Sequence, residues 1–389
     1  MKVVILGCGA VGSVLVKLLA KEKSIERVIC GDIVQREKFN NQKIKFVRLD
    51  ILTKRQFYNF LKKAKPDVVV NASSPLFNLV ILEACYENKI NYMDLAAQWD
   101  PDTDKKAKCP YKTEQFDYDK KFKEKNISGL ILAGVSPGMT NLFAREASEQ
   151  LDEIDSLKIR LVDYSGTDEL SFFWSKEALL DEIDSKPLIY KNNKFEIMEP
   201  FSGVEEFDFP KPFGKKKVNL ICQDEIGTLP FFINAKNIDI KDYDNQVDIQ
   251  KTLYELGFTS KNKIKTKDGE IAPIDLTSKI LPPVVEDIKE EKYYNAQFAF
   301  VVRAEGRKKG KAKMVQYWVM FPKQKEINNL NLNANFISYP TALSAKMFVM
   351  AIPKITQKGV FPPEALEKDV RKEIIQELEK TDVKISRSF

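Results

Sequence analysis

The chain has 389 residues, 43% of them hydrophobic and 30% charged, so its composition predicts about two folded domains and excludes a mostly disordered protein. The net charge of +6 is small for this length and does not indicate a nucleic-acid binder. No stretch approaches the roughly 18 apolar residues that a membrane span needs. The short apolar start is interrupted by glycines where a signal peptide would continue, so we expect a cytoplasmic protein.

Histidine is absent, and the five cysteines are scattered along the chain. The absence of histidine excludes Ser-His-Asp and Cys-His triads and every His-ligated metal site. The cysteines form no Cys-x-x-Cys pair, which predicts free thiols in a reducing compartment, with neither a disulfide framework nor a zinc site. An acid or base must therefore be Asp, Glu, Lys, Tyr, Cys or water.

The first third of the chain alternates short apolar strands with helices. Strands are predicted at 2–6, 27–31, 45–49, 67–71, 92–95 and 129–133, and helices at 13–21, 53–64, 76–88 and 114–125. Strict alternation with short connections predicts parallel pairing through right-handed crossovers. The expected fold class is therefore α/β, with a doubly wound parallel sheet of the Rossmann type.

A glycine-rich turn connects the first strand to the first helix. Gly7, Gly9 and Gly12 form a G-x-G-x-x-G pattern, with Ala10 and Val11 between the last two glycines. In this context the glycines provide a tight turn, close approach of the backbone to a pyrophosphate, and close packing of helix on strand. The turn predicts a site for NAD or NADP, and the alternative is a glycine-rich turn that binds nothing.

Polar residues at the ends of two later strands extend this prediction. Asp32 ends the second strand, where a carboxylate suits both ribose hydroxyls and so favours NAD, although Arg36 is close enough in sequence to meet a 2′-phosphate. Asn71, Ala72 and Ser74 follow the fourth strand and are predicted to contact the cofactor. The alternatives are a solvated strand-end carboxylate at Asp32 and an ordinary proline-containing turn after Asn71.

The pattern changes after residue 138. Strands at 156–163, 171–174 and 218–222, helices at 175–183 and 246–256, and hairpins at 188–198 and 297–321 predict an inserted α+β domain with an antiparallel sheet. Helices at 340–350 and 362–379 are expected to return to the first domain. The predicted division is a dinucleotide-binding domain at 1–138, a substrate and dimerisation domain at 139–338, and a returning segment at 339–389.

Several motifs in this order resemble the saccharopine dehydrogenase-like family of NAD(P)-dependent oxidoreductases, in particular the branch that includes lysine 6-dehydrogenase and carboxynorspermidine synthase. The motifs lie at 7–12, 92–96, 134–141, 172–175, 192–194, 227–230 and 359–364, with a further likeness from 110 to 125. The turn at 134–141, GVSPGMTN, is the most specific of them. The resemblance implies a Rossmann domain with an inserted α+β domain that binds substrate and forms a dimer.

The same turn lies at the predicted carboxyl edge of the sheet and at a helix N-terminus, where its backbone amides are suited to a nicotinamide amide or a substrate carboxylate. We expect Ser136 and Asn141 to contact the substrate and Pro137 the cofactor. The alternative is a turn that only caps its helix.

The favoured function is hydride transfer between a nicotinamide and a C–N bond of an amino-acid-derived substrate such as saccharopine. Asp94 is the first candidate for the acid–base group, because it ends the fifth strand where the nicotinamide is expected; Lys112 and Glu225 follow. Arg303 is predicted to bind a substrate carboxylate through its planar fork. A capping carboxylate at Asp94 and solvated side chains at the other two positions are the alternatives.

Two other functions remain open: a non-catalytic dinucleotide-binding protein, and an RNA-binding protein that uses the basic cluster at 307–311. We expect a small-molecule substrate, no nucleic acid or membrane partner, and a homodimer. The predicted dimer surface is the apolar hairpin residues Phe298, Phe300, Val302, Tyr317, Val319 and Phe321.

Overall fold

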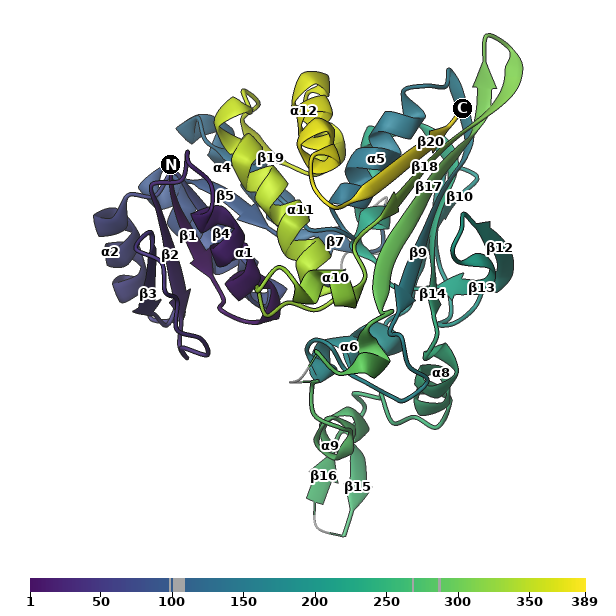
Figure 1. The fold of residues 1–389 in the computed structure, drawn as a ribbon, viewed down its shortest axis with the longest axis horizontal. Coiled ribbons are helices and arrows are strands. Elements are labelled where there is room, and N and C mark those ends of the chain that lie inside the picture. Colours follow the sequence, from purple (N-terminus) through teal and green to yellow (C-terminus); the bar gives the residue numbers. More distant parts are fainter. Residues whose placement is uncertain (98, 101–108, 268, 286–287) are drawn as a thin grey trace.

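The computed structural model describes residues 1–389 except 98, 101–108, 268 and 286–287. The purple and blue N-terminal strands make up most of one sheet, and the teal and green strands in the middle of the chain make up most of a second, long sheet (Figure 1). The C-terminal segment contacts both. Helix α11 (Ser338–Ala351) packs against α1 (Ala10–Ala20), whereas the final strand, β20, pairs with β18 of the second sheet.

The first sheet consists of seven parallel strands in the order β19-β8-β5-β4-β1-β2-β3. Its strands are β1 (Lys2–Leu6), β2 (Arg27–Asp32), β3 (Ile44–Arg48), β4 (Val68–Asn71), β5 (Asn91–Asp94), β8 (Ser128–Leu130) and β19 (Gly359–Phe361). The direction in which strands are added reverses between β1 and β4, and ligands of open α/β sheets bind at such a switch point. The predicted doubly wound sheet is confirmed.

Helices cover both faces of this sheet, because its apolar strands are buried on both sides. Val3 and Ile5 belong to the core cluster of α1, whereas Val4 and Leu6 belong to the opposite cluster with α2 and α3, as strand alternation requires. The remaining helices and small strands of this part are α2 (Lys54–Ala64), α3 (Asn78–Asn88), α4 (Asp119–Lys125), β6 (Trp99–Asp100) and β7 (Lys112–Thr113). None of the helices in the described residues combines the length and the apolar character that a bilayer crossing requires.

The second sheet has nine strands, and its main path runs β11-β10-β14-β9-β17-β18-β20, with β12 and β13 attached beside β14. Its strands are β9 (Glu153–Tyr164), β10 (Leu188–Lys191), β11 (Lys194–Ile197), β12 (Glu205–Phe209), β13 (Gly214–Leu220), β14 (Ala235–Asp244), β17 (Gln297–Lys308), β18 (Lys311–Met320) and β20 (Lys384–Ser388). Both predicted hairpins are present and antiparallel. Strand β14 runs parallel to β9, so the sheet is mixed rather than wholly antiparallel.

Other helices and a small hairpin surround the second sheet. They are α5 (Met139–Ser148), α6 (Lys176–Asp184), α7 (Leu229–Phe232), α8 (Val247–Glu255), α9 (Pro273–Ile280), α10 (Gln324–Asn328), α12 (Lys368–Glu379), β15 (Ile264–Thr266) and β16 (Gly269–Ile271). Helix α5 leads out of the first sheet and lies on the core face of the second. The rings of its Phe143 and of Phe300 on β17 are 5.8 Å apart.

The hairpin face that we predicted as a dimer surface is part of the chain's own core. Phe298, Phe300, Val302, Tyr317, Val319 and Phe321 are each at most 6% exposed. They pack in one cluster with α5 and α11. The prediction that this face is free for a partner is wrong, because alternation along β17 and β18 turns these residues toward the first domain.

Two further observations differ from the sequence predictions. Residues 171–174 form no strand, and Phe172 makes only an isolated bridge to Val284. Strands β19 and β20 were not predicted because both are short, and β20 places the chain end on the second sheet. The domain boundaries after residues 138 and 338 stay predictions.

The expectation of free thiols is wrong for Cys8 and Cys30, which the structure pairs as a disulfide. Cys8 follows β1 and Cys30 lies on the neighbouring parallel strand β2, so the pairing of the two strands brings them together. Cys85, Cys109 and Cys222 are free.

Candidate active site

The glycine-rich turn lies at the switch point of the first sheet. A Cβ atom on Gly12 would overlap the carbonyl oxygen of Gly7, so only glycine allows α1 to start this close to β1. On Gly7 a Cβ would lie 2.7 Å from the backbone nitrogen of Ser73, in the segment that follows β4. By contrast, no atom lies within 4 Å of a Cβ built on Gly9, which leaves this side of the turn open. Such an open backbone surface at a helix N-terminus fits the pyrophosphate of a dinucleotide.

Asp32 fixes the shape of this turn and remains partly exposed. Its Oδ2 accepts the Cys8 N–H at 2.6 Å and its Oδ1 accepts the Val34 N–H at 3.0 Å. Both contacts are to the backbone, so the carboxylate is held between the turn after β1 and the end of β2. Ile33 and Val34 beside it are 58% and 50% exposed, an apolar surface suited to a planar base.

The predicted cofactor residues after β4 are bound to their own loop. Asn71 is buried, and its amide donates to Asn78 Oδ1 at 2.7 Å and to the Ser74 carbonyl at 3.2 Å. Ser74 Oγ caps the short 3₁₀ turn that follows, at 3.3 Å from the Leu76 nitrogen. These side chains shape the loop, which presents its backbone and Ala72 to the glycine-rich turn.

Asp94, the first acid–base candidate, is 1% exposed and has donors on both oxygens. Its Oδ1 accepts the Leu132 N–H at 2.7 Å, and its Oδ2 accepts the Tyr92 hydroxyl at 2.9 Å and the Gln115 amide at 3.2 Å. Burial raises its pKa to about 7, although these donors act in the opposite direction. Asp94 therefore belongs to an internal polar network that ties β5 to its neighbours.

Glu225, another acid–base candidate, lies where the second domain meets the GVSPGMTN turn. It lies in the short 3₁₀ helix Asp224–Gly227 and is 0% exposed. Its Oε1 accepts the hydroxyls of Ser136 at 2.5 Å and Thr140 at 2.7 Å, whereas its buried Oε2 accepts no hydrogen bond from any described residue. Burial raises the pKa of Glu225. The structure thus brings the predicted residues Ser136 and Glu225 into direct contact.

A second carboxyl, Glu364, completes this junction. It follows β19 at the end of the GVFPPE stretch and is 0% exposed. Its Oε1 accepts the Thr228 hydroxyl at 2.6 Å, and its Oε2 accepts the Asn141 amide at 3.0 Å. Asn141 also accepts the Gly138 N–H at 2.9 Å, so it closes the turn as well. Burial raises the pKa of Glu364 to about 7.

We call Ser136, Thr140, Asn141, Glu225, Thr228 and Glu364 the junction network. Five of its residues come from the three motifs at 134–141, 227–230 and 359–364, and the sixth, Glu225, lies two residues before the second motif. Sequence reasoning missed Thr140, Thr228 and Glu364, although each of these residues lies inside one of those motifs. Their position inside these motifs was the signal that could have identified them as site residues.

Asp224 was also missed, although it directly precedes Glu225. Its Oδ2 accepts the Ala97 N–H at 2.7 Å, a contact from the second domain to the segment after β5. The side chain is partly exposed. Burial and the nearby charges of Glu225, Asp94 and Glu182 raise its pKa to about 8.

Of the two remaining candidates, Arg303 lies away from this junction. Arg303 lies on β17 with its guanidinium 4.5 Å from the ring centroid of Phe207 and bonded to Gln316 at 2.7 Å. Alternation places it on the face of the second sheet opposite to Val302 and α5. The backbone of Lys112 lies in β7, and its side chain falls outside the described part of the structure.

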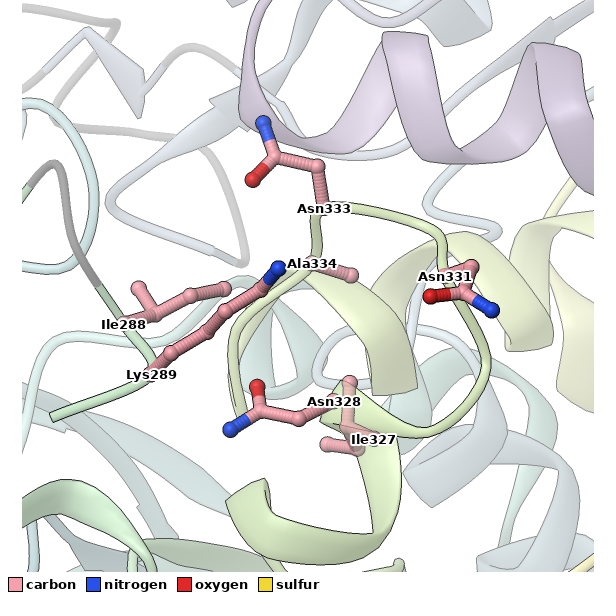
Figure 2. Close-up of a pocket in the computed structure, with 7 residues that line it drawn as sticks. All are labelled: Ile288, Lys289, Ile327, Asn328, Asn331, Asn333 and Ala334. Carbon is pink, nitrogen blue, oxygen red and sulfur yellow. The ribbon is translucent and has the colours of Figure 1, made fainter. Parts of the chain in front are cut away.

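Two surface cavities lie away from these residues. One of about 140 Å³ is lined by Asn328, Asn331 and Asn333 together with Ile288, Lys289, Ile327 and Ala334 (Figure 2). The other, of about 460 Å³, lies beside Tyr190, Phe195 and Phe231. Neither is lined by a predicted site residue.

Comparison with known proteins agrees with this geometry. The family description "Saccharopine dehydrogenase NADP binding domain" matches residues 3–130, and "Saccharopine dehydrogenase C-terminal domain" matches residues 134–383. The chain belongs to the saccharopine dehydrogenase family. It is therefore an NAD(P)-dependent oxidoreductase that acts on a C–N bond, which confirms the reaction class of the favoured function.

Individual relatives are distant in sequence but similar in extent. The chain is 27% identical to the carboxynorspermidine synthase of Vibrio alginolyticus, over 79% of this chain and 75% of that protein. It is 25% identical to the carboxyaminopropylagmatine dehydrogenase of Synechocystis, over 95% and 93%. The apo structure of the L-Glu-forming saccharopine dehydrogenase from Saccharomyces cerevisiae has a TM-score of 0.71 at 12% identity, covering 100% of this chain and 99% of that one, and shows the shared fold.

Proposed function

We propose that this oxidoreductase acts on the C–N bond of a substrate that carries a positively charged amine. The observation that carries the proposal is the set of carboxyls on the second domain whose pKa values burial raises: Asp163, Glu182, Asp224, Glu225, Asp242 and Asp244. Within the described residues, none of them forms an ion pair with Lys or Arg. The names of both relatives also contain an amine, carboxynorspermidine in one and carboxyaminopropylagmatine in the other.

Like charges raise the pKa values of neighbouring carboxyls: Asp244 and Glu182 raise that of Asp163, and Asp163 in turn raises that of Asp242. A bound ammonium group would relieve this repulsion, whereas a substrate carboxylate would increase it. The set therefore supports a diamine or polyamine-derived substrate over saccharopine, which carries more carboxylates than this surface favours.

For the cofactor we propose NAD, bound along the open side of the glycine-rich turn. The α1 N-terminus and the Gly9 backbone would hold the pyrophosphate, and Asp32 the adenosine ribose. Its carboxylate, fixed by two backbone donors, would repel a 2′-phosphate. When bound, the nicotinamide would supply or accept the hydride. If titration showed NADPH binding tenfold more tightly than NADH, about 1.4 kcal/mol, the Asp32 argument would be lost.

The chain's own residues would then orient the substrate and handle its proton. The junction network holds the GVSPGMTN turn rigidly against the second domain, because each of its hydroxyls and amides has a fixed partner. We propose Ser136 and Pro137 as the part of this turn nearest to the nicotinamide. Asn141 and Glu225 act behind it by keeping the turn in place.

The function is tested by following NADH and NADPH absorbance with matched pairs of compounds. Diamines and agmatine, each with a small aldehyde, form one arm, and lysine or glutamate with the same aldehydes the other. We expect oxidation of the reduced cofactor in the amine arm. Turnover only in the amino-acid arm would contradict the amine proposal, and cofactor binding with no turnover in either arm would favour a non-catalytic dinucleotide-binding protein.

We also propose a homodimer, formed through a surface other than the buried hairpin face. The measurement is light scattering at micromolar concentration, where a mass of two chains is expected. A monomer mass would contradict this proposal.

A further inference from the structure

Four carboxyls lie in or beside the junction network, and they differ in the hydrogen bonds that their oxygens accept. Asp94 and Glu364 have donors on both oxygens and are at most 1% exposed. Glu225 has two donors on Oε1 and is closed off from solvent around Oε2. None of these three has an oxygen that a substrate nitrogen can approach without rearrangement of the surrounding core.

Asp224 combines a fixed orientation with an open oxygen. The Ala97 N–H holds Oδ2 at 2.7 Å, and no donor from the described residues bonds to Oδ1. The carboxyl comes from the second domain, and its donor comes from the segment after β5, which leaves the carboxyl edge of the first sheet. It therefore stands between the elements that would carry substrate and nicotinamide. A group that transfers a proton needs this combination of anchored geometry and access.

We propose that Asp224 is the catalytic carboxyl that exchanges a proton with the substrate nitrogen, an inference that rests on the proposed function. In the reductive direction, the O–H bond of Asp224 breaks as an N–H bond forms at the imine nitrogen. The C=N π bond is replaced by a C–H bond whose two electrons come from the hydride of NAD(P)H, so carbon is reduced and the dinucleotide oxidised. Water then returns a proton to the carboxylate, and the oxidative direction reverses each change.

The surroundings of Asp224 support this role. Partial burial and the carboxyls of Glu225, Asp94 and Glu182 raise its pKa to about 8, whereas the Ala97 N–H acts in the opposite direction. The Cys222 thiol also interacts with it. At neutral pH Asp224 thus keeps its proton and is ready to donate it, as an acid with a pKa near the working pH should be.

The decisive variant is Asp224→Asn, whose amide oxygen can still accept the Ala97 N–H and so preserve the fold. We expect turnover to fall by about 10²–10⁴-fold, with the affinity for NAD(P)H and the melting temperature unchanged. The native pH–rate profile should have a limb near pH 8, where the rate changes as Asp224 titrates, and this limb should be absent in the variant. Asp248→Asn, an exposed Asp on α8, is the matched control and should behave like the native enzyme.

A second variant separates proton transfer from general electrostatics. Glu182→Gln removes one like charge from the surroundings of Asp224, so the limb should move to lower pH rather than vanish. The proposal would be overturned if Asp224→Asn and Glu182→Gln lost the same amount of turnover and the pH–rate profile of both variants still changed near pH 8. Native turnover in Asp224→Asn would do the same.

A measurement without substrate distinguishes failure of this inference from failure of the proposed function. Infrared difference spectra of the holoenzyme between pH 6 and 10 should contain a protonated-carboxyl band that titrates near pH 8 and is missing in Asp224→Asn. Absence of that band from the native protein would overturn the inference even if amine turnover is found. Its presence, with no amine turnover, would instead place the error in the proposed substrate.

Discussion

The glycine-rich turn and the junction network occupy the same edge of the first sheet but are built in different ways. The turn consists of neighbouring residues, and its geometry follows from the missing side chains of Gly7 and Gly12. The junction network joins side chains from segments more than two hundred residues apart, such as Asn141 and Glu364. A site formed by local backbone is visible in the sequence, whereas a site formed by distant side chains requires the fold.

The strongest test of this contrast is a pair of glycine substitutions. In Gly12→Ala the new Cβ meets the Gly7 carbonyl, so α1 must shift and we expect cofactor affinity to fall by at least 100-fold together with the melting temperature. Gly9→Ala meets no protein atom, so its melting temperature should be native while a bound pyrophosphate is crowded and affinity falls. Calorimetric titration with NADH and thermal melts measure both.

Native affinity in Gly9→Ala would show that the dinucleotide does not approach this backbone. The assignment of the open side of the turn to the pyrophosphate would then be lost, although the packing role of Gly12 would stand.

Substitutions in the junction network should lower the stability of the fold more than the affinity for the cofactor. Glu364→Ala leaves the Asn141 amide and the Thr228 hydroxyl without their acceptor in a buried site, which we expect to lower the free energy of unfolding by about 2–4 kcal/mol. Glu364→Gln keeps one acceptor oxygen and should lose less. Urea unfolding of both variants gives the values, and equal stability of Glu364→Ala and the native chain would exclude a structural role for this carboxyl.

The sequence predicts features that depend on a local residue pattern, and it does not predict contacts between side chains that are distant along the chain. The strand–turn–helix at 2–20, the doubly wound sheet and both hairpins were predicted from period and turn chemistry. Glu364 was not, because a carboxyl after a short strand looks the same whether it caps a turn or bonds to Asn141 across the domain junction. The guanidinium of Arg303 suits a carboxylate, but strand alternation turns it to the other face of the sheet, and its role as a substrate ligand stays a prediction.

The pH dependence of stability tests Glu364 of the junction network together with Asp94, the buried carboxyl at the end of β5. Asp94 and Glu364 have folded-state pKa values raised to about 7, above the unfolded values near 4. The folded protein therefore holds these protons more tightly, so their contribution is complete below about pH 4 and is lost as pH rises through 7. We expect the free energy of unfolding to fall by on the order of 1 kcal/mol per pH unit per group between pH 5 and 7.

Denaturant unfolding across this range provides the measurement, and Asp94→Asn the comparison. The variant lacks one of the titrating carboxyls, so its profile should be flatter, even if its absolute stability is lower because Tyr92 and Gln115 lose an acceptor. Identical slopes in the two proteins would contradict the raised pKa of Asp94.

The smallest effect is expected at Arg303, on the far face of the second sheet. Its guanidinium lies over the Phe207 ring and bonds to Gln316, so Arg303→Gln should lower the free energy of unfolding by only about 0.5–1 kcal/mol. Turnover and the KM for substrate should be native, because the sheet and the cluster around α5 separate Arg303 from the junction. A raised KM with native stability would show that Arg303 is a substrate ligand after all. The substrate would then have to bind on the far face of the second sheet rather than at the junction.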